Sequence, residues 1–371
     1  MTEIDVADLS SRVLWAAFGL AAIFGAIAQR THFCTMGAVS DIVIMNDWTR
    51  ARMWALAIAA ATLGFNVMVG LGWIAARDTV YGGPRLAWLS VLAGGVMFGF
   101  GMVLASGCGS KNLVRLGGGN LKSLVVLLVL GVSAFATIRG ITAVLRVNTV
   151  ERVSVELAKG QDLPSLLSAS TGIASPTLAW VLGAGLALLM AAWVLSEAAG
   201  RTREVWLGGL GIGAVIAAMW WVSGRLGHLA EDPNTLEEVF LATNSRRMEA
   251  LSMVAPLAYA LDWLMFFSDK SKLLTIGIVS MAGVVAGSAV SALARREFRW
   301  EGFANTRDLV NHLAGGLLMG VGGITALGCT VGQGLSGVST LSLGSFIALG
   351  AIVSGALLAL RLQVWRLERA A

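Results

Sequence analysis

Long apolar runs separated by short polar segments dominate this chain. Runs of about 17 to 25 residues recur along the chain, long enough for a helix to cross the roughly 30 Å hydrocarbon layer of a membrane. The pattern predicts an all-α polytopic membrane protein with about 9–10 transmembrane helices plus re-entrant or half-helices, because several runs are short. The candidate spans are 13–29, 51–76, 86–106, 121–145, 176–199, 205–222, 254–267, 273–294, 308–326 and 340–361.

Composition strengthens the membrane assignment. Hydrophobic residues make up 56% of the chain and charged residues 13%, with a mean hydropathy of +0.77, whereas about 25% of residues in a soluble domain are charged. The net charge of +5 lies in the loops, so it gives no indication of a nucleic-acid partner. The basic residues of alternate loops favour neither orientation. We expect one membrane domain over residues 1–371, surrounded by lipids.

Two segments are too polar to lie in the membrane, at 151–171 and 228–247. The sequence Glu231-Asp-Pro-Asn-Thr-Leu-Glu-Glu has the residues of a helix start and is followed by apolar positions. We therefore expect short amphipathic helices on the membrane surface in both segments.

Each of the three cysteines stands where an apolar run gives way to glycine and polar residues. Irregular backbone at membrane depth is tolerated only where it is covered by protein or lines a cavity. The cysteines are at least 74 positions apart, with no Cys-x-x-Cys pair and no Cys/His cluster, so neither a disulfide framework nor a metal site is expected. A phosphate-binding loop for ATP is also missing, and no cofactor is expected.

An internal repeat connects two of the cysteines. Six residues recur in the same order 221 positions later. The offset also places Asn112 on Gln333, but Lys111 on Gly332, so only one copy is charged. We predict a pseudo-twofold pair of repeat-like segments at about 13–145 and 273–361, joined by a connecting and peripheral segment at about 146–272, with a substrate site between them. The recurring residues are Gly95, Gly99, Gly101, Ala105, Gly107 and Cys108, matched by Gly316, Gly320, Gly322, Ala326, Gly328 and Cys329.

The chemistry of these breaks favours an anion. Where a helix begins inside the membrane, its first N–H groups have no intrahelical partner and carry about half a positive charge. Sulfur is soft, and a thiol is a weak donor, so thiols suit a ligand that itself presents sulfur. No catalytic residue is expected. The predicted substrate-binding residues are Cys34, Cys108, Cys329, Gly107, Gly109, Gly328, Thr330, Asn112, Gln333 and Lys111.

Three motifs, His32-Phe-Cys-Thr-Met-Gly-Ala38, Leu104-Ala-Ser-Gly-Cys-Gly109 and Ala326-Leu-Gly-Cys-Thr-Val-Gly-Gln-Gly334, resemble those of the YeeE/YedE family. Characterised members of that family look like thiosulfate uptake transporters. The resemblance implies a compact helical fold with a central constriction. Thiosulfate would pass Cys34, Cys108 and Cys329 by transient S–H···S contacts. The resemblance also implies a location in a bacterial inner membrane and a partner, a separate cytoplasmic sulfurtransferase of the TusA type. It leaves another sulfur or selenium species open as the substrate.

Other interpretations remain open beside a transporter. A membrane thiol oxidoreductase would need two thiols whose Cα atoms lie within about 7 Å, and the sequence has no adjacent pair. A channel for a small neutral solute is a third interpretation. Lys111 and Arg115 could steer anions or anchor the chain at the interface, and Asn112 and Gln333 could bind substrate or have a structural role. Energy coupling, membrane orientation and oligomeric state cannot be predicted from the sequence.

Overall fold

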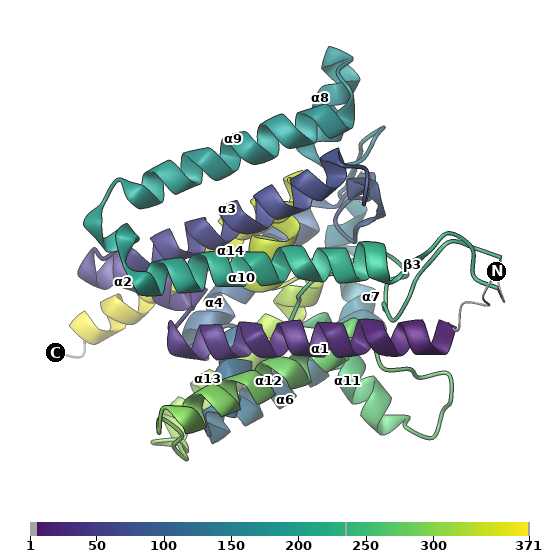
Figure 1. The fold of residues 1–371 in the computed structure, drawn as a ribbon. Coiled ribbons are helices and arrows are strands. Elements are labelled where there is room, and N and C mark those ends of the chain that lie inside the picture. The colour runs from purple at the N-terminus through teal and green to yellow at the C-terminus, as the bar shows by residue number, and fades with distance from the viewer. Residues whose placement is uncertain (1–5, 234–235, 370–371) are drawn as a thin grey trace.

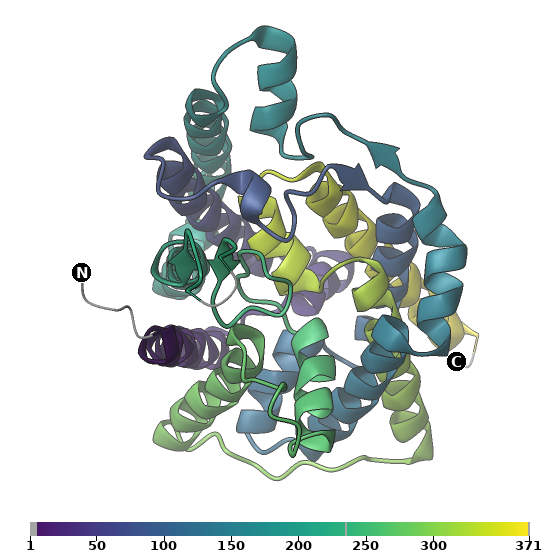
Figure 2. The ribbon, with the colours of Figure 1, turned by 90° about the vertical axis from the view of Figure 1, so that its right-hand side faces the viewer.

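The computed structural model describes residues 6–233 and 236–369. Helices α1, α3, α9 and α10 run roughly side by side, and α8 stands off from the bundle above one end of α9 (Figure 1). After a quarter turn many helices are seen nearly end-on, and the yellow-green segment that precedes α14 lies toward the middle of the bundle (Figure 2). The helices are α1 Val6–Arg30, α2 Thr35–Met45, α3 Thr49–Gly70, α4 Trp88–Leu104, α5 Gly109–Gly117, α6 Leu121–Arg139, α7 Ile141–Asn148, α8 Leu163–Thr171, α9 Ser175–Leu195, α10 Arg203–Trp221, α11 Ala255–Met265, α12 Ile276–Ala294, α13 Thr306–Thr325 and α14 Leu343–Glu368.

The remaining elements are short and confirm the all-α class. Two antiparallel pairs of two-residue strands lie outside the long helices. The strands are β1 Arg85–Leu86, β2 Val155–Glu156, β3 His228–Leu229 and β4 Val239–Phe240, and the short helices are η1 Ala76–Asp78, η2 Val150–Arg152, η3 Ala198–Arg201, η4 Val222–Leu226 and η5 Gly332–Gly337.

Eight helical segments of the described chain are long and apolar enough to cross a membrane, fewer than the nine or ten expected. The segment expected at 254–267 forms only α11, whose eleven residues are too short to span. The segment expected at 308–326 forms α13, which has the length but carries Arg307, Asp308 and His312 near its start. These polar positions explain why hydropathy alone miscounts the spans.

Three local expectations are corrected. Helix α6 ends at Arg139, so the span expected to reach residue 145 was more than a turn too long, and α7 begins separately after Gly140. In the described part of 228–247, β3 pairs with β4 and no helix forms. The predicted helix start at 231–238 includes residues 234–235, which lie outside the described residues. The polar segment at 151–171 does contain a helix, α8, capped by the Asp162 carboxylate.

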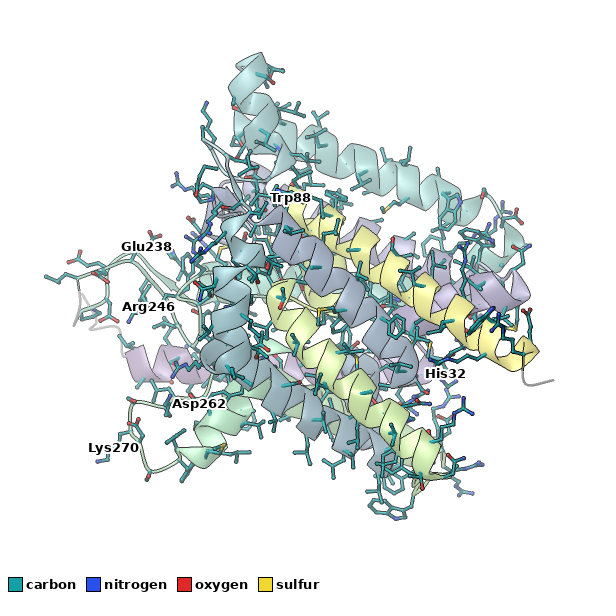
Figure 3. The ribbon with its side chains drawn as sticks, turned by 180° about the vertical axis from the view of Figure 1, so that it is seen from behind. His32, Trp88, Glu238, Arg246, Asp262 and Lys270 are labelled. Atoms are coloured by element: carbon teal, nitrogen blue, oxygen red, sulfur yellow. The ribbon has the colours of Figure 1, made fainter. Side chains whose placement is uncertain are left out.

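The bundle has two polar ends, visible on opposite sides in Figure 3. We call one the His32 face, where α1 ends and α3 begins, and the other the Glu238 face, formed largely by the 227–254 loop. Lys270 lies on the Glu238 face, with Arg246 and Asp262. If the segment 254–267 is counted as a span, the loop that follows it, with Lys270, falls on the side of Arg30. In the structure Lys270 lies on the opposite face, so a tally of loop charges that includes this span favours no orientation.

Glycines allow the central helices to approach closely. Helix α4 packs against α13 and α14, while α13 also packs against α6. A Cβ atom built on Gly99 would lie 2.0 Å from the Ile352 carbonyl oxygen, and one on Gly320 would lie 2.5 Å from the Leu130 carbonyl oxygen. Backbone contacts this close require glycine, as is common at helix interfaces in membranes.

The contact between α4 and α13 is reciprocal. A Cβ atom on Gly94 would lie 2.6 Å from Gly322 O, and one on Gly322 would lie 2.6 Å from Gly94 O. Gly101 and Gly315 approach each other in the same way. Under the 221-residue offset, the pair Gly94–Gly322 corresponds to the pair Gly315–Gly101. The two glycine runs therefore make matching contacts, and the duplication of the whole unit stays a prediction.

Candidate functional site

The three cysteines occupy the same local backbone structure. In each case a helix ends, one residue adopts the left-handed conformation, and a second helix begins directly after the cysteine. A non-glycine residue with positive φ is uncommon, so its recurrence at one position is informative. The residues are His32 (φ 51°), Ser106 (φ 55°) and Leu327 (φ 58°), each two positions before a cysteine.

Hydrogen bonds fix this shape in the same way at every break. The N–H of the residue before the cysteine donates to the carbonyl oxygen five positions earlier, which is the helix-ending bond of a Schellman motif. The cysteine carbonyl then accepts the first bond of the next helix. The helix-ending bonds are Phe33 N to Ala28 O (3.2 Å), Gly107 N to Met102 O (2.8 Å) and Gly328 N to Gly323 O (2.8 Å).

Each thiol therefore lies at the N-terminal, electropositive end of a helix. Cys34 Sγ accepts a hydrogen bond from Gly37 N at 3.3 Å, and Cys329 Sγ accepts one from Gly332 N at 3.4 Å. Cys108 Sγ lies 3.2 Å from Ser110 Oγ and also interacts with the N–H of Lys111. Donors at the same relative position surround all three sulfur atoms, an arrangement suited to holding negative charge.

Cys108 interacts with both of the other cysteines. The side chains of Cys34 and Cys108 interact directly, and Cys108 interacts electrostatically with Cys329. All three thiols are free and buried. Sequence separation had indicated no adjacent pair, and the fold corrects this, because Cys34 and Cys108 are neighbours in space.

A buried hydroxyl lies in the same cluster. The Thr330 hydroxyl is fully buried beside the Cys108 thiol, a weak hydrogen-bonding partner, and no oxygen or nitrogen atom of the described residues is hydrogen-bonded to it. A buried polar group without a partner is costly. A ligand passing between Cys108 and Cys329 would satisfy it.

The two carboxamides predicted as ligand donors hold the breaks together. Asn112 Nδ2 donates to Gly107 O at 2.9 Å and to Cys108 O at 3.1 Å. Gln333 Nε2 donates to Ala326 O at 2.6 Å, while its Oε1 accepts from Ser345 Oγ at 2.6 Å. Both N–H groups of the Asn112 amide, and one of the two on Gln333, thus donate to the backbone of the break itself. This geometry favours a positioning role over direct ligand contact.

Of the two repeated breaks, at Cys108 and Cys329, only the one at Cys108 has basic residues close to it. Lys111 is partly buried, interacts electrostatically with Cys34 and Cys108, and has no ion pair in the described part of the chain. Arg115 is engaged differently, since its Nη1 donates to Ser106 O at 2.6 Å. Arg115 therefore fixes the left-handed residue of the break, and Lys111 retains its charge for a ligand.

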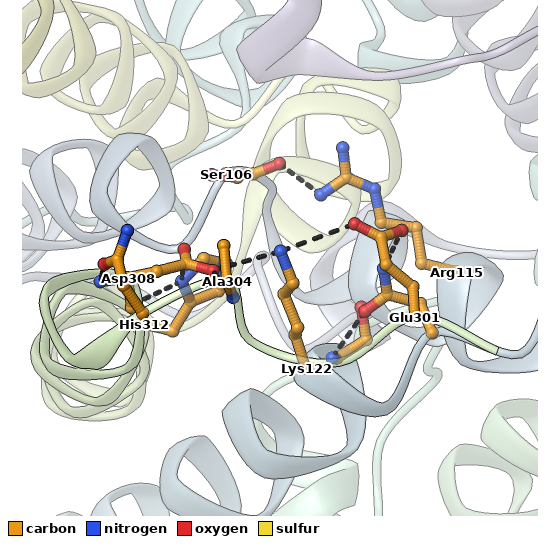
Figure 4. A network of polar contacts seen from close by, with 10 residues as sticks. Ser106, Arg115, Lys122, Glu301, Ala304, Asp308 and His312 are labelled. Atoms are coloured by element: carbon orange, nitrogen blue, oxygen red, sulfur yellow. Dashed lines mark hydrogen bonds and ion pairs between the residues drawn. The ribbon is translucent and has the colours of Figure 1, made fainter.

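A network at the start of α6 and α13 holds the adjoining helix ends (Figure 4). Lys122 Nζ lies 3.4 Å from Glu301 Oε1 and 3.0 Å from Asp308 Oδ2, and His312 Nδ1 lies 3.0 Å from Asp308 Oδ1. Glu301 also accepts from the Asn120 side chain. Lys122 lies between the carboxylates of Glu301 and Asp308, so the network joins the starts of the two helices and has a structural role. His312 is explained by it without a role in binding.

The break at Cys329 adjoins a cavity of about 260 Å³. Leu327 and Gly328 line it, together with Ser252 and Tyr81. A Cβ atom on Gly332 would lie 2.9 Å from Ser252 Oγ and 3.4 Å from Tyr81 Oη, so both hydroxyls adjoin the helix that follows Cys329. Burial raises the pKa of Tyr81 well above its ordinary value, which keeps its hydroxyl a neutral donor.

A larger cavity, of about 680 Å³, lies elsewhere on the Glu238 face. It is lined by residues including Trp73, Lys159 and Asp162, and by no residue of the three breaks. Because Leu327 and Gly328 of the Cys329 break line the smaller cavity, we assign that cavity to the site. The described residues contain no group of three or more His, Cys, Asp or Glu side chains that could hold a metal ion.

The predicted residues thus separate into two groups. Thr330, Lys111 and the three thiols meet in one cluster, and Gly107, Gly109 and Gly328 belong to the backbone beside it, whereas the carboxamides face the backbone. Ser110, Ser252 and Tyr81 were missed. Ser110 could have been found, because it lies two residues after Cys108. No local pattern identifies Ser252 or Tyr81, which approach from other segments.

Comparison with known proteins agrees with this arrangement. The profile of a family described as Sulphur transport matches residues 30–358. The chain is 26% identical over 343 residues to the thiosulfate transporter TsuA of Escherichia coli, covering 90% of each protein. It is 27% identical over 353 residues to the thiosulfate transporter TsuA of Spirochaeta thermophila, covering 91% of this chain and 94% of the relative.

These matches confirm the YeeE/YedE resemblance and the expectation of a transporter with no enzymatic activity. With eight candidate spans in the described residues, the chain is a multi-pass protein of the inner membrane. It belongs to the Sulphur transport family.

Proposed function

We propose that the protein takes up thiosulfate along a path that passes Cys329, Cys108 and Cys34. The observation that carries the proposal is the threefold recurrence of one structure, a buried thiol at the start of a helix after a left-handed residue. The names of the two TsuA relatives support thiosulfate as the substrate. Such a dianion presents both a terminal sulfur and oxygens, which suits thiols beside backbone N–H groups.

The path begins at the 260 Å³ cavity in this proposal. Thiosulfate sheds water there onto the Ser252 and Tyr81 hydroxyls and then meets Cys329. At the centre, Thr330 donates to an oxygen while the Cys108 S–H donates to the terminal sulfur. The ion then reaches Cys34, where Lys111 offsets part of its charge.

The contacts are weak, and throughput depends on this weakness. A thiol is a poor hydrogen-bond donor, so no single cysteine holds the ion strongly. Transport through several sites requires binding that admits the ion without retaining it. Asn112 and Gln333 act as positioning residues, because they fix the carbonyls on either side of each break. A TusA-type sulfurtransferase remains a proposed partner.

The test is uptake of radiolabelled thiosulfate into proteoliposomes, with unlabelled sulfate, sulfite and selenite as competitors. The proposal expects saturable uptake that unlabelled thiosulfate competes for better than sulfate does, since sulfate lacks the terminal sulfur. Saturable uptake of sulfate or selenite but not thiosulfate would refute the substrate.

The interaction of Cys34 with Cys108 raises a second candidate, transfer of electrons through these two thiols. A redox relay would proceed through a mixed disulfide. Cys34→Ser and Cys108→Ser separate the two functions. A carrier loses uptake with no change in redox state, whereas a relay accumulates a mixed disulfide on the remaining thiol that mass spectrometry detects.

A further inference from the structure

One carboxylate lines the cavity beside the Cys329 break. Glu249 belongs to the 241–254 loop, and the same cavity is lined by Leu327 and Gly328, directly before Cys329. The Glu249 Oε1 accepts hydrogen bonds from the Ser245 backbone N–H, at 2.8 Å, and from the Ser245 hydroxyl. A dianion on the proposed path would thus share a cavity of only about 260 Å³ with this acid.

No cation neutralises Glu249 within the described residues. Arg146 lines the same cavity, but its Nη1 pairs with Glu151 Oε1 at 3.2 Å, and its Nε is buried without a hydrogen-bond partner. The Ser245 hydrogen bonds favour the ionised form of Glu249. Burial opposes them and is the larger effect, so the pKa of Glu249 is raised above its ordinary value.

The other groups that face the acid do not replace a counter-ion. Tyr81 from the loop after α3 and Tyr259 from α11 both interact electrostatically with Glu249, and burial raises the pKa of each, so both stay neutral. The Cys329 side chain interacts electrostatically with Tyr81. Farther along α11, Asp262 faces Tyr259 and is paired with Lys272, and Arg139 faces the same tyrosine.

We propose that Glu249 is a proton-binding gate of the cavity. When its carboxyl group is protonated, the cavity admits a dianion, and the O–H becomes one more donor for it. When it is ionised, repulsion between like charges at close range excludes the dianion. The gate rests on the proposed function, since it acts only on an anion that enters through this cavity.

Reciprocity gives the gate a second consequence. If protonation of Glu249 favours binding of the dianion, binding must favour protonation by the same factor. Thiosulfate remains a dianion at mildly acidic and neutral pH, so a proton taken up on binding comes to the protein. Binding is therefore accompanied by proton uptake from the buffer.

The experiment compares the unmodified protein with Glu249→Gln in proteoliposomes held at equal pH inside and outside. Uptake of radiolabelled thiosulfate by the unmodified protein should fall as pH rises, by up to about tenfold per pH unit above the pKa of the gate. Glu249→Gln should transport at every pH with little change. Glu249→Asp keeps a titrating group and should retain a pH dependence.

The matched control is Asp262→Asn, which removes a buried acid that Lys272 already neutralises, and its pH profile should follow that of the unmodified protein. Calorimetric titration of purified protein in two buffers of different ionisation enthalpy should show proton uptake on thiosulfate binding, lost in Glu249→Gln. The same pH profile in the unmodified protein and Glu249→Gln would overturn the gate alone. Uptake missing at every pH in the unmodified protein would overturn the proposed function, and the gate with it.

Discussion

The breaks at Cys108 and Cys329 share one backbone but lie in different surroundings. Both follow a glycine-rich helix, both have a left-handed residue two positions before the thiol, and both use a carboxamide to bind the preceding carbonyls. Charge differs, because Lys111 follows Cys108 where Gly332 follows Cys329. On the path we propose, this one backbone shape has two roles: the charged break attracts the ion, and the uncharged break beside the cavity receives it.

The largest expected effect tests whether the two helices before the breaks are packed alike. A leucine at Gly99 or at Gly320 would collide with backbone atoms of α14 or α6. We expect either substitution to lower the free energy of unfolding by about 3 kcal/mol, measured as a fall in the thermal midpoint in detergent. Gly350→Leu is the control, since nothing lies within 4 Å of its Cβ position. If one of the two leucine variants kept the stability of the unmodified protein, the helices before the two breaks would not be packed alike.

A second prediction concerns the carboxamides. Asn112→Ala leaves Gly107 O and Cys108 O without their side-chain donor, and Gln333→Ala does the same to Ala326 O. Each should cost about 2 kcal/mol of stability, the usual penalty for an unsatisfied buried polar group. Thermal melting checks this. If either variant kept full stability and lost only affinity for thiosulfate, that carboxamide would contact the ligand directly.

A third prediction addresses the charge difference. Lys111→Met should raise the KM for thiosulfate about tenfold, equivalent to about 1.4 kcal/mol of lost binding, with little effect on stability, because Lys111 has no ion pair in the described chain. Lys122→Met is the matched control. Its charge is used by Glu301 and Asp308, so it should lower stability and leave KM unchanged. An unchanged KM in Lys111→Met would show that the difference in charge between the two breaks does not affect thiosulfate binding.

The smallest effect is on the pH dependence of stability. Because burial raises the pKa of Glu249 in the folded protein, the folded state binds this proton more tightly than the unfolded state does. That contribution to stability is present below the unfolded pKa and is lost as pH rises through the folded pKa. Glu249→Gln should therefore gain thermal stability relative to the unmodified protein as pH increases. A difference in thermal stability between Glu249→Gln and the unmodified protein that stayed constant across pH would contradict the raised pKa of Glu249.

The sequence was enough to predict the helical class and the position of all three breaks, because a rare cysteine beside glycine interrupts an apolar run at each one. It could not predict that Cys34 and Cys108 meet, since their contact depends on how helices distant in sequence pack. Tyr81, Ser252 and Glu249 come from loops whose course hydropathy does not determine. A surface helix was expected within 228–247, but in the described residues of that segment β3 pairs with β4 and no helix forms.

The most direct measurement is thiosulfate uptake by Cys108→Ser, normalised to folded protein in the membrane. Serine caps a helix well and keeps a hydrogen-bond donor, so the break should survive while the soft contact with sulfur is lost. We predict uptake at least about tenfold below that of the unmodified protein, a loss of about 1.4 kcal/mol or more. Uptake at the unmodified rate would contradict the claim that buried thiols at the helix breaks carry the ion.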